Sequence, residues 1–338
     1  MVLHAFPLDP ELPGLLAASD PERAVELVRP VVDGAGSCQV ELVTYGRRDR
    51  CVLRYRIDQD TPGARTLYAK VYREGPDEAA RLAAAAVRAA VAAGGPFTVA
   101  GLAAYDTELR VALIEPVPGT ARVPALVKSG SDPGRLEADL VICTRLAAAV
   151  HGADADAPER TVDAELAALR QELIGVGGRS PALGIRLTRW LAPVEAAAAA
   201  TEPLPLSPAH GHLGLSHLLL DGDRCGLIDL DSICLAEPAL DLGSFLAHLR
   251  LAVARAGGPA GDNGYEERAD RLAGVVLGAY ADAAGVDLEL LRRRVAVFEA
   301  ISLARTALRS WEKLKVARLM DVLRLMHERP NPVRVTAR

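Results

Sequence analysis

The chain has 338 residues, of which 50% are hydrophobic and 25% are charged. It is long enough to bury a sizeable core, as one large two-lobed domain or as two ordinary domains. The formal net charge of -5 gives no broad electrostatic reason to bind nucleic acid or an anionic membrane. No apolar run approaches the roughly 18 to 20 residues of a membrane helix, and the N-terminus lacks the pattern of a secretory signal. We therefore expect a globular, cytoplasmic protein without nucleic-acid or membrane partners.

Cysteine usage indicates buried thiols. The five cysteines form no C-x-x-C pair and mostly lie in apolar runs. An odd number without metal-binding spacing predicts free thiols rather than a disulfide framework or a zinc site.

The first third of the chain reads as a helical extension, residues 1–37, followed by a small sheet. Three strand-like segments are separated by the turn-forming stretches "GRRDR" and "DQDTPGAR", which predicts an antiparallel meander over 38–45, 51–57 and 66–72. A helix is expected next over 76–95, opened by a Pro-Asp pair and closed by two glycines. Two further short strands are predicted over 97–106 and 110–117.

After "PVPGT" the pattern becomes largely helical. Helix-like periodicity is found over 134–151, 162–175, 183–200, 239–256, 265–283 and 287–327. The exception is 210–231, where "HLLL", "DGDR" and "CGLIDL" predict two short strands around an Asp-Gly turn.

This order of elements, together with four motifs, resembles the aminoglycoside phosphotransferase and choline kinase family of small-molecule kinases. The family's loop H-G-D-x-x-x-x-N and its later I-D-[FWL] are matched by "HGHLGLSHLL" and "LIDLD". "EPALDLGSFLAHL" is similar to the family's D-P-A-x-D-L-A segment, and "AAAVHG" to its L-A-x-L-H-x. The similarity runs over roughly 38 to 325.

The resemblance implies an α+β, bilobal, protein-kinase-like fold. A small antiparallel-sheet N-lobe with one helix, 38–119, would bind the nucleotide. A larger, mostly helical C-lobe, 120–330, would carry the catalytic loop and bind the acceptor, and 331–338 would be a tail. The implied reaction is phosphoryl transfer from ATP or GTP, with Mg²⁺, to a hydroxyl group.

The resemblance also places the nucleotide. Lys70, on the third strand between Ala69 and Val71, matches the lysine that reaches the phosphates. Glu78 is the only glutamate that the following helix offers to this lysine. Backbone groups around Glu115 to Val117, in "LIEPVPG", match the hinge that meets the adenine edge. Arg47, with Arg48 and Arg50 in the turn "TYGRRDR", is a candidate phosphate contact.

Three aspartates are assigned roles in the C-lobe. Asp229 follows the apolar strand "CGLI", which would carry its carboxylate into a cleft, and the family supplies Mg²⁺ as its partner. Asp231 is a second metal ligand, a substrate-binding residue or a satisfied polar residue. Asp241, in "ALDLGSF", caps the next helix or braces the catalytic loop.

The catalytic loop departs from the family pattern at two positions. His210 matches the loop histidine, which has a structural role, but His212 replaces the catalytic aspartate and His217 replaces the metal-binding asparagine. A neutral imidazole accepts a proton at pH 7, because its unperturbed pKa is about 6.5, and activity should then fall below that pH. Imidazole is a poor ligand for Mg²⁺, which prefers oxygen.

Three interpretations of the loop therefore stay open. The chain is an altered kinase, a pseudokinase that binds nucleotide or a protein partner without turnover, or a transition-metal protein with His210, His212, His217 and Asp229 as ligands. The acceptor is a hydroxyl of a small molecule or peptide. Because 301–326 is rather basic, the sequence favours a neutral or acidic acceptor.

Overall fold

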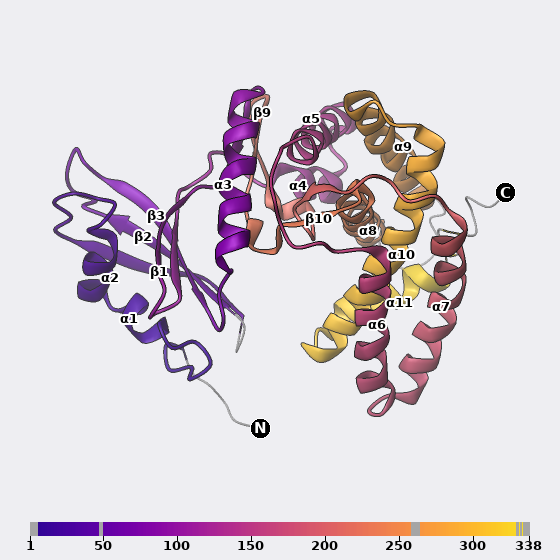
Figure 1. Ribbon diagram of the computed structural model, residues 1–338, viewed down its shortest axis with the longest axis horizontal. Coiled ribbons are helices and arrows are strands. Elements are labelled where there is room, and N and C mark those ends of the chain that lie inside the picture. Colours follow the sequence, from indigo (N-terminus) through magenta and orange to yellow (C-terminus); the bar gives the residue numbers. More distant parts are fainter. Residues whose placement is uncertain (1–5, 47–49, 258–263, 329–330, 332, 334–338) are drawn as a thin grey trace.

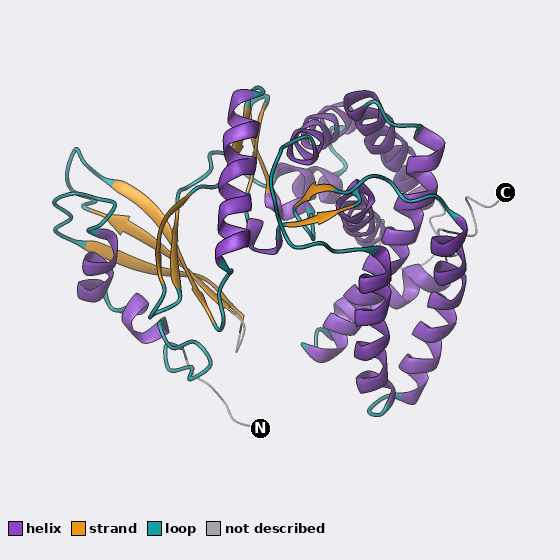
Figure 2. Ribbon diagram, viewed as in Figure 1, coloured by secondary structure: helices purple, strands orange, loops and turns teal. Residues whose placement is uncertain are grey.

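The computed structural model describes residues 6–46, 50–257, 264–328, 331 and 333. A sheet-rich part and a helix-rich part lie side by side (Figures 1 and 2). The first contains a five-stranded antiparallel sheet in the order β1-β2-β3-β6-β5. Its strands are β1 (Cys38–Gly46), β2 (Arg50–Ile57), β3 (Arg65–Tyr72), β5 (Leu102–Asp106) and β6 (Val111–Ile114). The expected α+β fold, with an antiparallel sheet before a mostly helical lobe, is confirmed.

Alternation along the strands decides which side chains face the interlobe space. Cys51, Leu53, Tyr55 and Ile57 of β2 are buried on one face of the sheet, with Leu67, Ala69 and Val71 of β3. Two short helices of the N-terminal extension, α1 (Leu15–Ser19) and α2 (Pro21–Val28), contribute to this core. Because successive side chains alternate, Lys70 of β3 lies on the opposite face.

Helix α3 (Glu78–Ala93) stands between the sheet and the helical lobe (Figure 1). Its N-cap Asp77 accepts a hydrogen bond from the Ala80 N–H at 2.7 Å. The buried face of α3 belongs to the larger core of the helical lobe, and not to the core under the sheet. The helix therefore lies next to the sheet but packs with the C-terminal part.

The predicted single strand over 97–106 is wrong, because the segment divides between two sheets. β4 (Phe97–Val99) pairs in parallel with β9 (Arg224–Leu227), which also pairs with β8 (Leu218–Asp221). The chain then turns at Gly101, where a Cβ atom would lie 2.3 Å from both the Arg88 guanidinium and the Glu115 carboxylate. The alternating apolar pattern is common to both halves, so it did not reveal the change of sheet.

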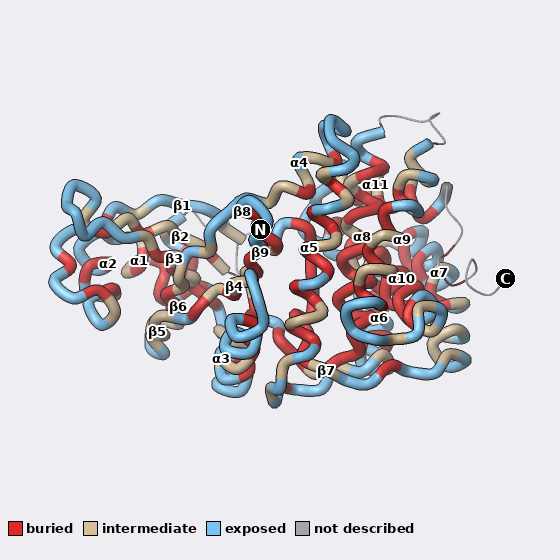
Figure 3. The backbone as a smooth tube through the Cα atoms, turned by 90° about the horizontal axis from the view of Figure 1, so that it is seen from above, coloured by how far each residue is buried: buried red, intermediate tan, exposed pale blue. Residues whose placement is uncertain are grey.

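The helical lobe contains eight α-helices in the part of the chain that the structure describes. They are α4 (Arg122–Ser129), α5 (Pro133–His151), α6 (Val162–Gly177), α7 (Pro181–Ala200), α8 (Pro238–Ala256), α9 (Gly264–Ala284), α10 (Leu288–Glu312) and α11 (Val316–Glu328). Buried residues are concentrated along α5, α8 and α10 (Figure 3). The short helix α4 was not predicted, since eight residues carry little periodicity.

The predicted helix over 287–327 is also interrupted. α10 ends at Glu312 and α11 begins at Val316, and Leu314 between them has a left-handed backbone with φ of 51°. The Lys315 N–H donates to the Ser310 carbonyl oxygen at 2.8 Å, which closes the end of α10. Apolar periodicity continues through the turn, so the sequence pattern did not mark the break.

The loop and hairpin region lies between α7 and α8. The Asp-Gly turn predicted within 210–231 is present between β8 and β9, with Gly222 at φ of 57°. A further small pair joins β7 (Ser207–Ala209) and β10 (Cys234–Ala236). The five cysteines are buried and free, as predicted. Among the described helices, none combines the length and the apolar character needed to cross a membrane.

Candidate active site

Four charged side chains, Arg50, Lys70, Asp229 and Asp231, form a cluster that joins the sheet to the segment after the β8–β9 hairpin. Lys70 Nζ lies 2.8 Å from Asp229 Oδ1 and 3.1 Å from each carboxylate oxygen of Asp231. Arg50 of β2 contacts Asp229 through two nitrogens, at 2.9 and 3.1 Å, and lies 3.5 Å from Asp231 Oδ2. The structure thus brings the predicted residues Lys70, Asp229 and Asp231 together, and two cations are matched by two carboxylates.

Local backbone geometry and charge keep Asp229 ionised and aimed at the cluster. The residue follows β9 and has a left-handed conformation, with φ of 71° and ψ of 50°. Its side chain is 11% exposed. Burial alone would raise the pKa of this carboxyl group, but the Lys70 ammonium and the Arg50 guanidinium hold the pKa well below its usual range. Asp229 therefore remains an anion throughout the physiological pH range.

A cavity of about 170 Å³ opens beside this cluster. Its walls come from β3, α3, β5 and β6, with Ala84, Leu102 and Ile114 among the apolar lining residues and Lys70 and Asp229 at the charged end. An apolar pocket that ends in fixed charges suits a planar base joined to phosphates.

Three of the predicted nucleotide contacts are not brought into this cavity. Glu78 is exposed at the start of α3 and is not among the partners of Lys70, which pairs with the two aspartates instead. Glu115 forms an ion pair with Arg88, and its N–H donates to the Gly101 carbonyl oxygen at 2.8 Å. Like Glu115, Val117 does not line the cavity.

The phosphate-loop arginine Arg47 lies outside the described residues. Arg50, at the start of β2, reaches the carboxylates of Asp229 and Asp231. Sequence reasoning noted Arg50 only as one arginine of three, because a turn pattern does not specify which side chain points inward.

The loop that begins at His210 is fixed by a buried aspartate. The Asp241 carboxylate accepts from the backbone N–H groups of His210, at 2.6 Å, and Leu213, at 3.3 Å. His151 Nε2 lies 3.2 Å from the same carboxylate. Asp241 is in the first turn of α8, but its side chain contacts the loop, while the N-cap position belongs to Glu237. The structure therefore shows Asp241 bracing the loop.

Gly211, between His210 and His212, lets the loop backbone pass close to the backbone at Ser232. Gly211 has φ of 85°, and a Cβ atom there would lie 2.1 Å from the Ser232 carbonyl oxygen. His210 Nε2 is 3.0 Å from the Ile228 carbonyl oxygen, so this nitrogen carries the proton and donates. His210 consequently joins the loop to the strand that carries Asp229.

His212 and His217 occupy the places of the family's aspartate and asparagine. His217 Nδ1 accepts from the Gly214 N–H at 3.2 Å, and His217 Nε2 lies 3.8 Å from Asp229 Oδ2. Burial, reinforced by neighbouring histidines, lowers the pKa of both imidazoles to about 3. His212 therefore stays neutral well below pH 6.5. Its protonation does not cause the fall in activity that the sequence predicts below that pH.

The three loop histidines also form a compact donor group. One ring nitrogen of each lies within 4.8 Å of the others, and Nδ1 of His210 and His212 is buried without a hydrogen-bond partner. The His210 hydrogen bond to a backbone carbonyl is the type of contact that orients a metal-binding imidazole. His217, however, accepts a hydrogen bond at Nδ1. When neutral, it therefore carries its proton on Nε2, the nitrogen that lies 3.8 Å from Asp229.

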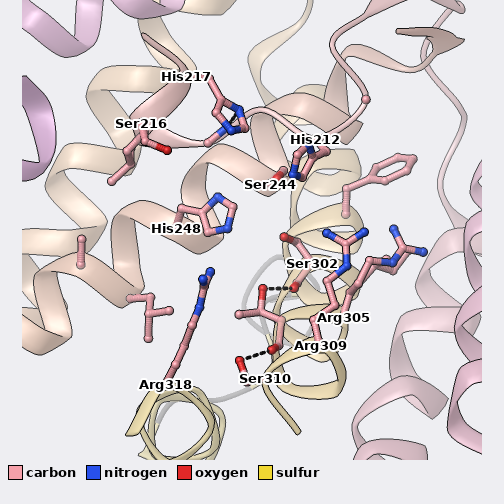
Figure 4. A pocket seen from close by; sticks show the side chains of 18 of the residues that line it. His212, Ser216, His217, Ser244, His248, Ser302, Arg305, Arg309, Ser310 and Arg318 are labelled. Carbon is pink, nitrogen blue, oxygen red and sulfur yellow. Dashed lines mark hydrogen bonds between the residues drawn. The ribbon is translucent and has the colours of Figure 1, made fainter. Parts of the chain in front are cut away.

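A second cavity, of about 420 Å³, lies on the other side of the loop. His212, His217 and His248 face it from one side, and Arg305, Arg309 and Arg318 from the other (Figure 4). Sequence reasoning missed Arg160, which donates to the Gly211 carbonyl oxygen at 2.8 Å and pairs with Glu165. No motif marks Arg160, and its contact with the loop at Gly211 spans 51 positions of sequence.

The chain matches the family model of the phosphotransferase enzyme family over residues 51–281. A choline/ethanolamine kinase family protein from Mesorhizobium loti is 19% identical, with 96% of each chain covered and a TM-score of 0.61. A macrolide 2′-phosphotransferase from Brachybacterium faecium is 18% identical, over 90% of this chain and 96% of that one, with a TM-score of 0.52. The GDP complex of an aminoglycoside 2′-phosphotransferase variant is 12% identical, over 91% and 97%, with a TM-score of 0.62.

These solved structures share the fold, and the resemblance inferred from the sequence motifs is confirmed. No curated protein matches the chain significantly by sequence.

Proposed function

Because the chain belongs to the phosphotransferase enzyme family, we propose that it transfers a phosphoryl group from ATP or GTP, with Mg²⁺, to a hydroxyl group of a small molecule or peptide. The observation that carries the proposal is the meeting of Lys70 and Asp229 at the charged end of an apolar cavity. Phosphoryl transfer needs positioned charges more than covalent chemistry from the protein. A solved neighbour that holds GDP supports a nucleotide as the donor.

The donor set at the cluster suits a hard cation. Both Asp229 and Asp231 present carboxylate oxygens to the same ammonium group, within 3.1 Å, and Mg²⁺ binds through carboxylates and phosphate oxygens. These two residues would hold Mg²⁺, which would neutralise charge on the transferred phosphoryl group. His217 offers nitrogen and does not fit this ion; we assign it to orientation of Asp229, from which it is 3.8 Å away.

The protein's own residues then divide the work. Lys70 and Arg50 bind the phosphates and balance the carboxylates. His212, neutral because burial lowers its pKa to about 3, accepts a hydrogen bond from the acceptor hydroxyl and orients it. A base of such low pKa removes a proton weakly, which suits a loose transition state in which base catalysis contributes little.

A second candidate is a pseudokinase that binds nucleotide or a protein partner without turnover. It is favoured by the two histidines at the positions of the family's aspartate and asparagine. A kinase and a nucleotide-binding pseudokinase both bind nucleotide and differ in turnover, whereas a pseudokinase that binds only a protein partner would show neither nucleotide binding nor turnover.

The test measures thermal stabilisation by ATP or GTP with Mg²⁺, and then ADP or GDP release with an acceptor panel. Lys70→Met should abolish the nucleotide-dependent shift. Lys128→Met, which removes an exposed lysine of α4, is the matched control and should keep it. Stabilisation without release for every acceptor would favour the pseudokinase, and equal shifts in wild type and Lys70→Met would reject the nucleotide site.

A further inference from the structure

The charge of the larger cavity does not balance. Its basic lining residues come from α8, α10, α11, the turn between the last two, and the segment before α6. Among the lining residues that the structure describes, Glu165 is the one carboxylate. Glu165 is buried and already pairs with Arg160 and Arg305. It is therefore not available to neutralise a third cation or to receive a cationic ligand.

Two arginines of the cavity have no carboxylate within ion-pair distance among the described residues. Arg309 projects from the end of α10 and is exposed to the cavity. Arg318 projects from the start of α11, and its Nε is buried without a hydrogen-bond partner. By contrast, Arg255, which also lines the cavity, pairs with Asp321 at 2.7 Å. Arg309 and Arg318 are thus two guanidinium groups of the cavity without a carboxylate partner among the described residues.

The surrounding protein makes this charge unfavourable in the free state. Burial, together with Arg305, lowers the pKa of the Arg309 guanidinium, and burial, together with Arg255, lowers that of Arg318. Although Glu172 acts in the opposite sense on Arg309, a cation that is partly withdrawn from water and lies beside other cations is stabilised by an anion. Guanidinium groups recognise carboxylate, sulfate and phosphate through paired N–H donors.

The break between α10 and α11 creates this arrangement. The left-handed turn at Leu314 redirects the chain, so that Arg309 before it and Arg318 after it line the same cavity. Figure 4 shows Arg309 pointing toward the side of the cavity that carries His212, and Arg318 pointing toward His248. A ligand held by both arginines would extend toward the loop on which His212 stands.

We propose that this cavity binds a small-molecule acceptor through an oxyanion group, held by Arg309 and Arg318, with its hydroxyl directed to His212. The volume of about 420 Å³ is of the size of small-molecule sites. This inference rests on the proposed function, and it names the substrate class: an alcohol that also carries a phosphate, sulfate or carboxylate group.

The test uses inorganic phosphate as the probe, measured by calorimetry and thermal shift on the full chain. Wild type should bind phosphate, and Arg309→Met and Arg318→Met should each weaken the affinity at least about tenfold, as expected for the loss of a charge-assisted contact. Arg309→Lys should retain part of the affinity. Arg292→Met removes an exposed arginine of the same helix outside the cavity and should bind as wild type does.

Two further variants and readouts separate this inference from the proposed function. Lys70→Met should lose nucleotide stabilisation but keep phosphate binding, whereas Arg309→Met should keep nucleotide stabilisation. The melting temperature of Arg309→Met without phosphate should be unchanged or raised, because a repelled cation is removed. Absence of phosphate binding in wild type, phosphate binding lost in Lys70→Met, or unchanged affinity in both arginine variants would each overturn the inference.

Discussion

The cavity beside Asp229 and the cavity beside His212 differ in how their charges are matched. On the sheet side, Lys70 and Arg50 face Asp229 and Asp231 within 3.5 Å. On the side of α10 and α11, Arg309 and Arg318 form no ion pair with a carboxylate of the described residues. A balanced cluster is ready for a ligand that brings its own cation, such as a nucleotide with Mg²⁺, and an unbalanced one is suited to a bare anion.

This difference indicates where the chain has kept the family pattern and where it has diverged. Lys70 and Asp229 match the family's motif residues on the side of the proposed phosphate donor, while the two loop positions that depart from the motif are His212 and His217. The basic cavity lies on the same side as the divergent residues. Under the proposed function, the departures from the motif fall on the acceptor side and not on the donor side.

The largest expected effect comes from breaking the balanced cluster. Asp229→Asn leaves Lys70 and Arg50 without their main partner and removes a proposed metal ligand. Turnover should fall by about 10²- to 10³-fold, the loss typical of one charge-stabilising group. Steady-state nucleoside diphosphate release is the measurement, with Asp221→Asn, at an exposed aspartate of β8, as the control. Wild-type turnover in Asp229→Asn would exclude this carboxylate from the chemistry.

Acid should destabilise the fold through the buried histidines. His212, His217 and His248 have folded-state pKa values of about 3, 3 and 4, lowered first by burial, against about 6.5 when unfolded. Between these values the unfolded chain binds more protons, so stability is complete above about pH 6.5 and falls as pH decreases, by about 1 kcal/mol per histidine per pH unit.

Urea unfolding from pH 7.5 to 5.5 measures this slope, in a range above the titration of most carboxylates. His248→Gln should reduce the slope by removing one of the three groups. A free energy of unfolding that does not change over this range would contradict the burial of neutral imidazoles.

Removing the Asp241 carboxylate that holds the loop should have a moderate effect. Asp241→Asn replaces a carboxylate that accepts from two loop N–H groups and contacts His151. Leaving buried polar groups unmatched should cost about 2 to 3 kcal/mol of unfolding free energy. Asp287→Asn is the matched control, because asparagine also caps helices and Asp287 caps α10. Equal losses in both variants would show that the brace contributes nothing specific.

The smallest expected effect is at His212, which lines the cavity of about 420 Å³. If His212 orients a hydroxyl, His212→Ala should lower turnover by roughly tenfold to a hundredfold, at the low end for a positioned base, and His212→Asp should keep turnover. The wild-type rate should not show a His212 titration between pH 5.5 and 8.5, because its pKa is about 3.

Metal analysis of the purified protein tests the alternative in which the three histidines bind a transition metal. Stoichiometric zinc or iron in the wild type, lost from both His212 variants together with activity, would favour the transition-metal interpretation of the three histidines.

Much of the donor side could be predicted from the sequence. Alternation along "TLYAKVY" places Lys70 opposite the buried face, and the apolar strand before Asp229 brings its carboxylate to the strand end. The motifs around His210 and Asp241 identified the loop. Glu78 and Glu115 were placed by the family pattern alone, and their contacts in the structure lie elsewhere.

The local periods of the chain by themselves determined the α+β order, the face on which Lys70 lies and the position of Asp229 after its strand, because these follow from neighbouring residues. Only the tertiary structure decided the charge balance. Arg305 meets Glu165 across 140 positions of sequence, and Arg50 meets Asp229 across 179. The turn at Leu314 brings Arg309 and Arg318 to one cavity without such a partner. Whether a charge is matched depends on which distant side chain packing places within a few ångströms, and no local pattern carries that information.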